Sequence, residues 1–270
     1  MTEDEVIRAR SALVVKSNSL IQKSRFSLSA QQQKIILYLI SKISPKDEAF
    51  HRYQFSINEF CRVCGLDASN GKNYLELRRA IKELRDKSIW VQLEDGRETL
   101  ISWIEKAYLE RNNGIVEIRL DEDLRPFLLN LKSNFTQFEL VYTLHFRSKY
   151  TIRLYELLQS VHFDKKESYS REYAVEELKK LLDAEKYKDY KNFKARVLLP
   201  SLKEINQYSD KTVICTEEKK GRRVTGITFT ISHKPIEERI AIQAEIERDL
   251  DAKWIDADSQ LSIFEREEID

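Results

Sequence analysis

Glycine, proline and cysteine are scarce in this chain, and no long apolar run occurs. Its 270 residues include six glycines, four prolines and three cysteines. So few chain breakers favour a helix-rich structure with short turns, and an odd number of cysteines argues against a disulfide framework. No stretch of about 18 apolar residues is present, and Met1 to Arg10 is too acidic for a signal peptide. We therefore expect a cytoplasmic protein that does not enter a membrane.

Residue patterns typical of catalysis are also missing. The histidines stand singly, at His51, His145, His162 and His233. A rolling-circle nicking enzyme would need two metal-binding histidines separated by one residue, and the sequence contains no such pair. Cys61 and Cys64 have no second pair of zinc ligands, so we expect them to pack in a core. No GxxxxGK loop for phosphate binding occurs. We predict a protein that is not an enzyme and has no cofactor or metal; nicking by one of the twelve tyrosines stays as an alternative.

What the chain does contain is apolar material and an uneven charge distribution. It is 41% hydrophobic and 34% charged, and this length allows two domains that each bury a core. Ile236 to Asp270 holds twelve acidic residues and four basic ones, which leaves 33 acidic and 42 basic residues before Ile236. A basic body suits a domain that binds a polyanion, because lysines and arginines that neutralise phosphates release counterions.

The apolar periodicity predicts the same order of elements twice. In the first unit we expect a helix at Leu28–Ile43, a strand at Tyr53–Ile57, a short helix at Asn58–Cys64 ending at Gly65, a long helix to Lys87, strands at Ile89–Leu93 and Thr99–Leu109 joined by a turn, and a strand at Ile115–Leu120. In the second we expect a helix at Arg147–Phe163, a strand at Glu172–Ala174, a short helix at Val175–Leu182, a long helix at Tyr190–Tyr208, and hairpin strands at Thr212–Thr216 and Arg223–Ile231.

This order is typical of a winged helix-turn-helix, and its repetition is more informative than one occurrence. Ile81-Lys-Glu-Leu84 in the first unit recurs as Leu202-Lys-Glu-Ile205 in the second. We predict an α+β fold of two tandem winged helices, in residues 1–120 and 121–235. An acidic helical or flexible tail in residues 236–270 follows, and 121–143 would link the two units.

The long helix of the second unit is the main candidate for DNA reading. Lys186 to Lys203 holds six basic residues against one acidic one. Helical spacing predicts a core stripe at Leu198, Leu202 and Ile205, and a polar stripe at Lys188, Asn192, Arg196 and Lys203. A recognition helix lies in the major groove, so we predict that Asn192 and Arg196 contact bases and that the lysines contact phosphates. The alternative is an ordinary solvated face.

Two lysines of this helix depend on its shape. Lys191 and Lys194 fall on the extrapolated core stripe, so they reach solvent only if the helix projects past the core or bends. Pro200 could supply the bend, because proline removes a helical hydrogen bond and crowds the preceding turn.

Three further groups are candidates for DNA contacts. The wing tip offers Lys219, Lys220, Arg222 and Arg223. The start of a helix offers Arg147, Ser148 and Lys149, where backbone N–H groups could hold a phosphate. The long helix of the first unit offers Lys72, Asn73, Arg78 and Arg79. For this last group, a protein interface or ordinary ion pairs along the helix are the alternatives.

The acidic tail has two apolar signals. Ile242, Ile246, Leu250 and Trp254 recur every four residues and predict a helix that packs against something. Further on, Gln260, Leu261, Ile263 and Phe264 give apolar anchors in an acidic end. Such anchors are typical of a docking peptide.

With these features, Leu13 to Lys234 resembles the iteron-binding initiator proteins of theta-replicating bacterial plasmids. Tyr150–Leu158 and Phe193–Asn206 are similar to that family's pre-recognition helix and second recognition helix, and Leu28–Lys34 and Asn73–Ile81 are similar to first-domain segments. The resemblance implies two winged helices that bind direct repeats in double-stranded DNA at a plasmid origin. It also implies opening of an adjacent AT-rich segment, recruitment of host replication proteins, and dimers that repress their own promoter in equilibrium with monomers that act at the origin.

Gln260, Leu261, Ile263 and Phe264 also look like the bacterial sliding-clamp-binding peptide, which would make the clamp a partner. A tandem winged-helix transcriptional repressor is the alternative within DNA binding. It would protect a lone inverted repeat and no tandem direct repeats.

Overall fold

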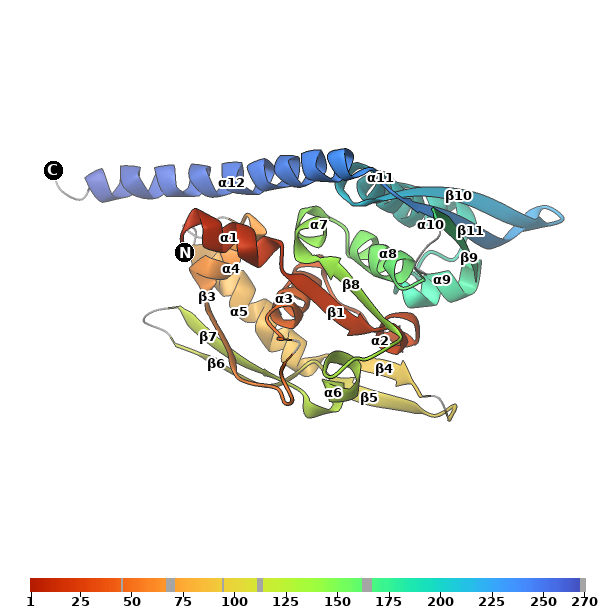
Figure 1. Cartoon of the computed structure of the whole chain (residues 1–270), viewed down its shortest axis with the longest axis horizontal. Helices are drawn as coiled ribbons and strands as arrows, with labels where there is room; N and C mark the ends of the chain where they lie inside the picture. Colours follow the sequence, from red (N-terminus) through yellow and green to blue (C-terminus); the bar gives the residue numbers. More distant parts are fainter. Residues whose placement is uncertain (45, 67–70, 94, 111–113, 162–166, 268–270) are drawn as a thin grey trace.

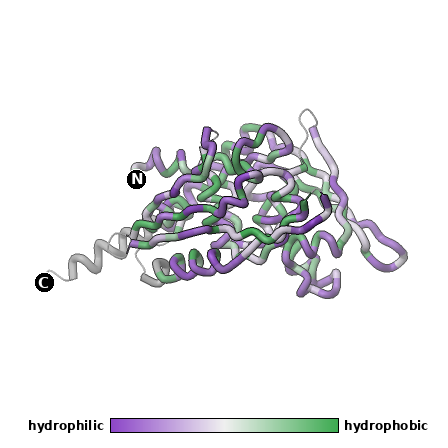
Figure 2. Tube along the Cα trace, turned by 90° about the horizontal axis from the view of Figure 1, so that it is seen from below, coloured by the Kyte–Doolittle hydropathy of each residue, from purple (hydrophilic) through white to green (hydrophobic). Residues whose placement is uncertain are grey.

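The structure is a computed structural model of the whole chain. It describes residues 1–44, 46–66, 71–93, 95–110, 114–161 and 167–267, with the side chains of 71–74 and 254–267 left aside. Helices and strands alternate along the chain and end in a long C-terminal helix (Figure 1). Apolar residues concentrate inside the molecule and hydrophilic ones on its outer loops (Figure 2). None of the described helices is both long and apolar enough to cross a membrane.

The first unit has the predicted order of helices and strands, with added elements before it. Its elements are α1 (Glu3–Arg10), β1 (Leu13–Ser17), α2 (Asn18–Gln22), β2 (Ser24–Arg25), α3 (Ala30–Ser41), β3 (Tyr53–Ser56), α4 (Ile57–Cys64), α5 (Gly71–Asp86), β4 (Ser88–Gln92), β5 (Glu98–Ser102), β6 (Ile104–Leu109) and β7 (Ile115–Leu120). α3 begins after Ser29, which forms a capping box with Gln32. α4 ends at Gly65, as predicted, and Gly65 has the left-handed conformation that glycine adopts without strain.

The prediction of one continuous strand at Thr99–Leu109 is wrong. The chain bends at Trp103, whose side chain is buried. β5 before the bend pairs with β4, and β6 after it pairs with β7. Two three-stranded sheets result, ordered β2-β4-β5 and β3-β7-β6. Trp103 and the next residue, Ile104, are both buried, which breaks the alternation expected of a single strand. This break was the signal in the sequence that the chain changes sheets here.

The second unit also follows the predicted order. It contains η1 (Glu122–Leu124), α6 (Arg125–Leu128), β8 (Phe135–Glu139), α7 (Leu140–His145), α8 (Lys149–Gln159), β9 (Ser168–Ala174), α9 (Val175–Leu181), α10 (Tyr190–Phe193), η2 (Lys194–Leu198), α11 (Leu199–Tyr208), β10 (Lys211–Lys220) and β11 (Arg223–His233). The tail that follows forms α12 (Ile236–Glu267). The sheet order is β10-β11-β9. β9 begins four residues earlier than predicted, because Ser168 to Ala174 all pair with β11.

The two units are joined through α8, which is buried from Tyr150 to Gln159. Arg153 of α8 donates hydrogen bonds to the carbonyl oxygens of Ile21 (2.6 Å) and Ser24 (2.9 Å). The Nζ of Lys16 in β1 lies 2.6 Å from the Glu156 carboxylate, and both side chains are about 2% exposed. β1 itself pairs with β8, so that the first strand of the chain lies beside a strand of the linker region. The Tyr150–Leu158 segment, whose sequence is similar to a pre-recognition helix, thus lies in the buried junction between the two units. The helix directly before the candidate reading helix is α9.

α12 runs from the second unit back across the first (Figure 1). Ile242, Ile246 and Leu250 are buried, which confirms the predicted packing of this stripe; the side chain of Trp254 lies outside those described. Leu250 lies so close to Gly65 that an added Cβ there would be 2.6 Å from Leu250 Cδ2. Gly65 therefore serves both the left-handed end of α4 and the close approach of α12.

Candidate nucleic-acid interface

The candidate reading helix is continuous from Tyr190 to Tyr208 but contains a π-helical turn at Lys194–Leu198. Within it the N–H of Leu199 donates to the carbonyl oxygen of Lys194, five residues back. Pro200 follows directly and has no N–H to continue the regular pattern. The widened turn lets the chain pass the proline without breaking the helix. The predicted bend near Pro200 is thus a local change in helical phase.

The change in phase decides which residues reach solvent. Leu198, Leu202 and Ile205 are buried as predicted, together with Phe193 and Val197. The helix residues with exposed side chains include Lys191, Asn192, Arg196 and Lys203. Lys188 is also exposed, but it precedes the N-cap Asp189 and so does not belong to the helical stripe predicted for it. Lys191 therefore lies outside the core even though regular spacing assigned it to the core stripe. The aromatic Phe193 takes the core position one turn before Val197.

Lys194 is only partly exposed, because it pairs with the sheet. Its Nζ lies 2.6 Å from Glu217 Oε1 on β10, and the Tyr190 hydroxyl donates to the same oxygen at 2.9 Å. The hydrogen bond between Lys194 and Glu217 raises the pKa of Lys194 and lowers the pKa of Glu217. Glu217, which the sequence did not single out, ties the N-terminal half of the helix to the wing strand. A phosphate contact by Lys194 would have to compete with this carboxylate.

Asn192 is held at the first turn of the helix by the N-cap residue. Asp189 accepts hydrogen bonds from the Asn192 backbone N–H at 2.8 Å and from its Nδ2 at 2.6 Å. These bonds lower the pKa of Asp189. An amide nitrogen carries two hydrogens, so Nδ2 keeps one for a base while Oδ1 stays available as an acceptor. Asn192 can therefore present the donor and acceptor pair that fits an adenine edge, already oriented by Asp189.

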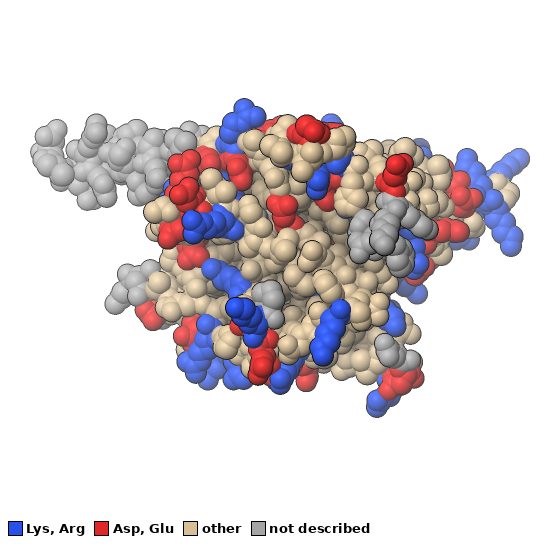
Figure 3. Space-filling view, viewed as in Figure 1, with Lys and Arg blue, Asp and Glu red and all other residues tan. Residues whose placement is uncertain are grey.

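The wing is the β10–β11 hairpin, which turns at Gly221 and Arg222. Gly221 has φ +65°, a conformation that glycine adopts without strain. Lys219, Lys220, Arg222 and Arg223 all have exposed side chains. Figure 3 shows lysines and arginines gathered at the end of the molecule where this hairpin projects. The composition of this basic tip was predictable from the sequence, and the fold places the tip at the end of a long hairpin.

The start of α8 differs from the expected open phosphate site. Ser148 caps the helix by accepting from Tyr150 N, and the Glu204 carboxylate accepts from the N–H of Arg147 at 3.1 Å. The Lys149 Nζ lies 2.5 Å from Asp183. Carboxylates of the protein therefore already lie where a phosphate was expected, and the exposed side chain of Arg147 is the group best placed to meet DNA.

The first unit presents its own basic groove. The side chains of Lys72 and Asn73 lie outside those described, but Arg78 and Arg79 are exposed on α5. With Lys82, Arg85 and Lys106 they line an open groove of about 890 Å³ between α5 and β6. Glu83, a possible partner in helical ion pairs, instead accepts a hydrogen bond from Gln32 Nε2 at 2.7 Å. Two carboxylates, those of Asp86 and Glu105, line the groove together with these basic residues.

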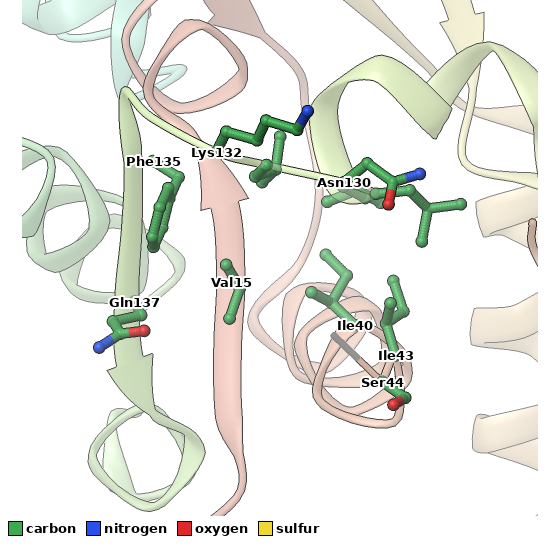
Figure 4. Close-up of a pocket in the computed structure, with 11 residues that line it drawn as sticks. Val15, Ile40, Ile43, Ser44, Asn130, Lys132, Phe135 and Gln137 are labelled. Carbon is green, nitrogen blue, oxygen red and sulfur yellow. The ribbon is translucent and has the colours of Figure 1, made fainter. Parts of the chain in front are cut away.

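Other predicted sites fall outside this surface. Cys61 and Cys64 are buried thiols in α4, and burial raises the pKa of Cys64 to about 12. Gln260, Leu261, Ile263 and Phe264 have side chains outside the described set. A separate pocket of about 330 Å³ lies between β1, the end of α3 and the segment after α6 (Figure 4). Its lining is mostly apolar, and none of the predicted DNA-binding residues belongs to it.

Known proteins share both the sequence pattern and the fold. A family model described as "Initiator Replication protein, WH1" matches residues 13–159, and one described as "Initiator Rep protein, WH2" matches residues 174–231. A replication initiation protein from Escherichia coli is 27% identical over 229 residues, covering 82% of this chain and 70% of that protein. A crystal structure of Pi initiator protein in complex with iteron DNA has a TM-score of 0.70 at 19% identity, covering 83% of this chain and 98% of that one.

Proposed function

Because the chain belongs to the family of replication initiator proteins with two winged helices, we propose that it initiates replication of a plasmid by binding direct repeats at the origin. The observation that carries this proposal is the exposed face of α10–α11, where Asn192 and Arg196 lie among lysines, beside a wing tip with four basic side chains. The similar fold of Pi initiator, which was crystallised with iteron DNA, supports it.

In this proposal each group has a defined task. α10–α11 enters the major groove, where Asn192 pairs with an adenine edge and Arg196 with a guanine edge. Lys188, Lys191 and Lys203 contact the phosphates on either side, and the wing tip holds the backbone further along the duplex. The α5 arginines of the first unit bind a neighbouring segment of the same repeat. Buried α8 keeps the two reading helices at a fixed separation.

Footprinting on DNA that flanks the protein's own gene tests this function. We expect protection of tandem direct repeats, and loss of protection when Asn192 and Arg196 are both replaced by alanine. Arg8→Ala is the matched control, because Arg8 is an exposed arginine on α1. Protection of a lone inverted repeat would favour a repressor, and absence of any protected segment would overturn sequence-specific binding.

We also propose the later steps that an initiator performs. Binding opens an adjacent AT-rich segment, which permanganate reactivity of unpaired thymines would detect. Host replication proteins then join the complex, and the sliding clamp is one partner through Gln260, Leu261, Ile263 and Phe264. Clamp capture should disappear when Leu261 and Phe264 are replaced by alanine; undiminished capture would contradict this partner.

Autorepression by a dimer is the remaining part of the proposal. Dimers would bind an inverted repeat at the promoter, while monomers bind the direct repeats. Sedimentation at several protein concentrations, combined with a promoter reporter, measures both. A protein that stays monomeric at every concentration and still represses would contradict the dimer model.

A further inference from the structure

Leu199 is a large apolar residue in the middle of the candidate reading helix, and its side chain is 51% exposed. It lies three residues after Arg196 and four before Lys203, both of which are also exposed. The neighbouring Leu198 is 1% exposed. The helix thus divides two adjacent leucines between its faces, one for the core and one for the basic surface.

Single exposed leucines are common on proteins and need no explanation by themselves. The position of this one is informative, because the exposed residues of α10–α11 are otherwise polar or small, apart from Pro200, and Leu199 is the large apolar side chain among them. The same combination occurs in the first unit, where Leu75 on α5 is 59% exposed and Arg78 and Arg79 follow it. Each of the two reading helices therefore presents one leucine among its basic residues.

The major groove of DNA offers one apolar feature to such a side chain. Thymine carries a 5-methyl group there, whereas cytosine carries an amino group and a bare ring carbon. A leucine that contacts this methyl buries apolar surface on both partners, and it leaves the amino group of a cytosine without a hydrogen-bond acceptor. The basic residues on either side would bind the DNA phosphates while the leucine contacts the base.

We propose that Leu199 is a specificity-determining residue that contacts the 5-methyl group of a thymine in the bound repeat. This inference rests on the proposed function, in which α10–α11 lies in the major groove. Arg196 and Leu199 are three residues apart, which is at most about 4.5 Å along the axis at the α-helical rise of 1.5 Å per residue. Successive base pairs are about 3.4 Å apart, so the thymine lies within about two base pairs of the one that Arg196 reads.

Deoxyuridine scanning tests the contact, because uracil differs from thymine only by the missing methyl group. The probe is a duplex carrying one repeat that the full-length protein protects in footprinting, with each thymine replaced in turn by deoxyuridine. We expect one position to weaken binding of the parent protein about fourfold, as loss of one buried methyl group predicts. Leu199→Ala should bind the thymine and deoxyuridine versions of that duplex equally.

Ile240→Ala is the matched control, because Ile240 on α12 is also a large exposed apolar residue, at 60%, and lies outside the candidate interface. It should keep the fourfold preference for thymine. The inference is overturned if no deoxyuridine position affects the parent protein, or if Leu199→Ala still distinguishes the two duplexes. Failure of the proposed function looks different, because the parent protein would then protect no repeat at all.

Discussion

The wing tip allows a quantitative prediction about salt dependence. Lys219, Lys220, Arg222 and Arg223 are exposed at the end of the β10–β11 hairpin. The nearest paired carboxylate is that of Glu176, 3.9 Å from Arg223 Nη2, and both side chains are well exposed. Such an exposed pair contributes little to stability. Replacing the four basic residues by alanine should therefore leave the fold intact and remove only contacts to DNA.

The size of the effect follows from counterion release. Each phosphate neutralised on duplex DNA adds about 0.9 to the slope of log affinity against log salt. If each of the four side chains contacts one phosphate, the variant's slope is shallower by about 3.6. Between 50 and 200 mM salt, the parent protein should then lose about 150 times more affinity than the variant. Each single alanine variant should account for about one quarter of the change in slope.

Fluorescence anisotropy with one labelled repeat, repeated across this salt range, measures the slope directly. Arg8→Ala is the control, because it removes one exposed arginine from α1 and should leave the slope unchanged. Parallel plots for the parent and the four-alanine variant would refute the reasoning, since they would mean that the tip does not touch phosphate. A variant that loses affinity equally at every salt concentration would refute it too.

Three further perturbations have defined outcomes. Arg196→Ala should cost about 1–3 kcal/mol in binding and relax specificity at one base pair, measured by competition with single-base variants of the repeat; a uniform loss against all duplexes would contradict base reading. Glu156→Gln should lower the free energy of unfolding in urea by roughly 3–5 kcal/mol, because it leaves Lys16 and Arg153 buried without a carboxylate; a nearly unchanged unfolding midpoint would contradict this. Burial lowers the pKa of His145 below its usual value, so the unfolded state binds the proton first and stability should be intact above about pH 6.5 and fall as pH drops below it, by at most about 1.4 kcal/mol per pH unit. His145→Gln should flatten that part of the curve, and an unaltered pH profile would assign it to other groups.

Local sequence patterns were sufficient for much of the second unit. The core stripe at Leu198, Leu202 and Ile205 is buried as predicted, because a helix packed on one side repeats its apolar residues at the helical period. The turn at Gly221 and the basic tip around it were also predictable, because a short hairpin turn favours glycine for local conformational reasons. The order of helices and strands, given twice, was enough to predict two winged helices.

The sequence alone could not predict which side chains are exposed in the N-terminal half of the reading helix. Regular spacing put Lys191 and Lys194 on the buried stripe, but the π-helical turn before Pro200 shifts the phase, and Phe193 takes the core position. A proline predicts that the regular hydrogen bonds of the helix are interrupted, but it does not predict whether the helix breaks, kinks or widens. The outcome depends on which arrangement packs against the rest of the domain.

The sequence by itself thus determined most elements of the two winged helices, their order and the basic character of the second reading helix, because these follow from periodicity and composition within short windows. Only the tertiary structure decided how the units are joined. β1 pairs with β8 across more than a hundred residues, and Lys16 meets Glu156 in the buried junction. It also decided that Glu217 holds Lys194 while Leu199 faces outward. Such contacts join segments far apart in the chain or depend on helical phase, and no local pattern records them.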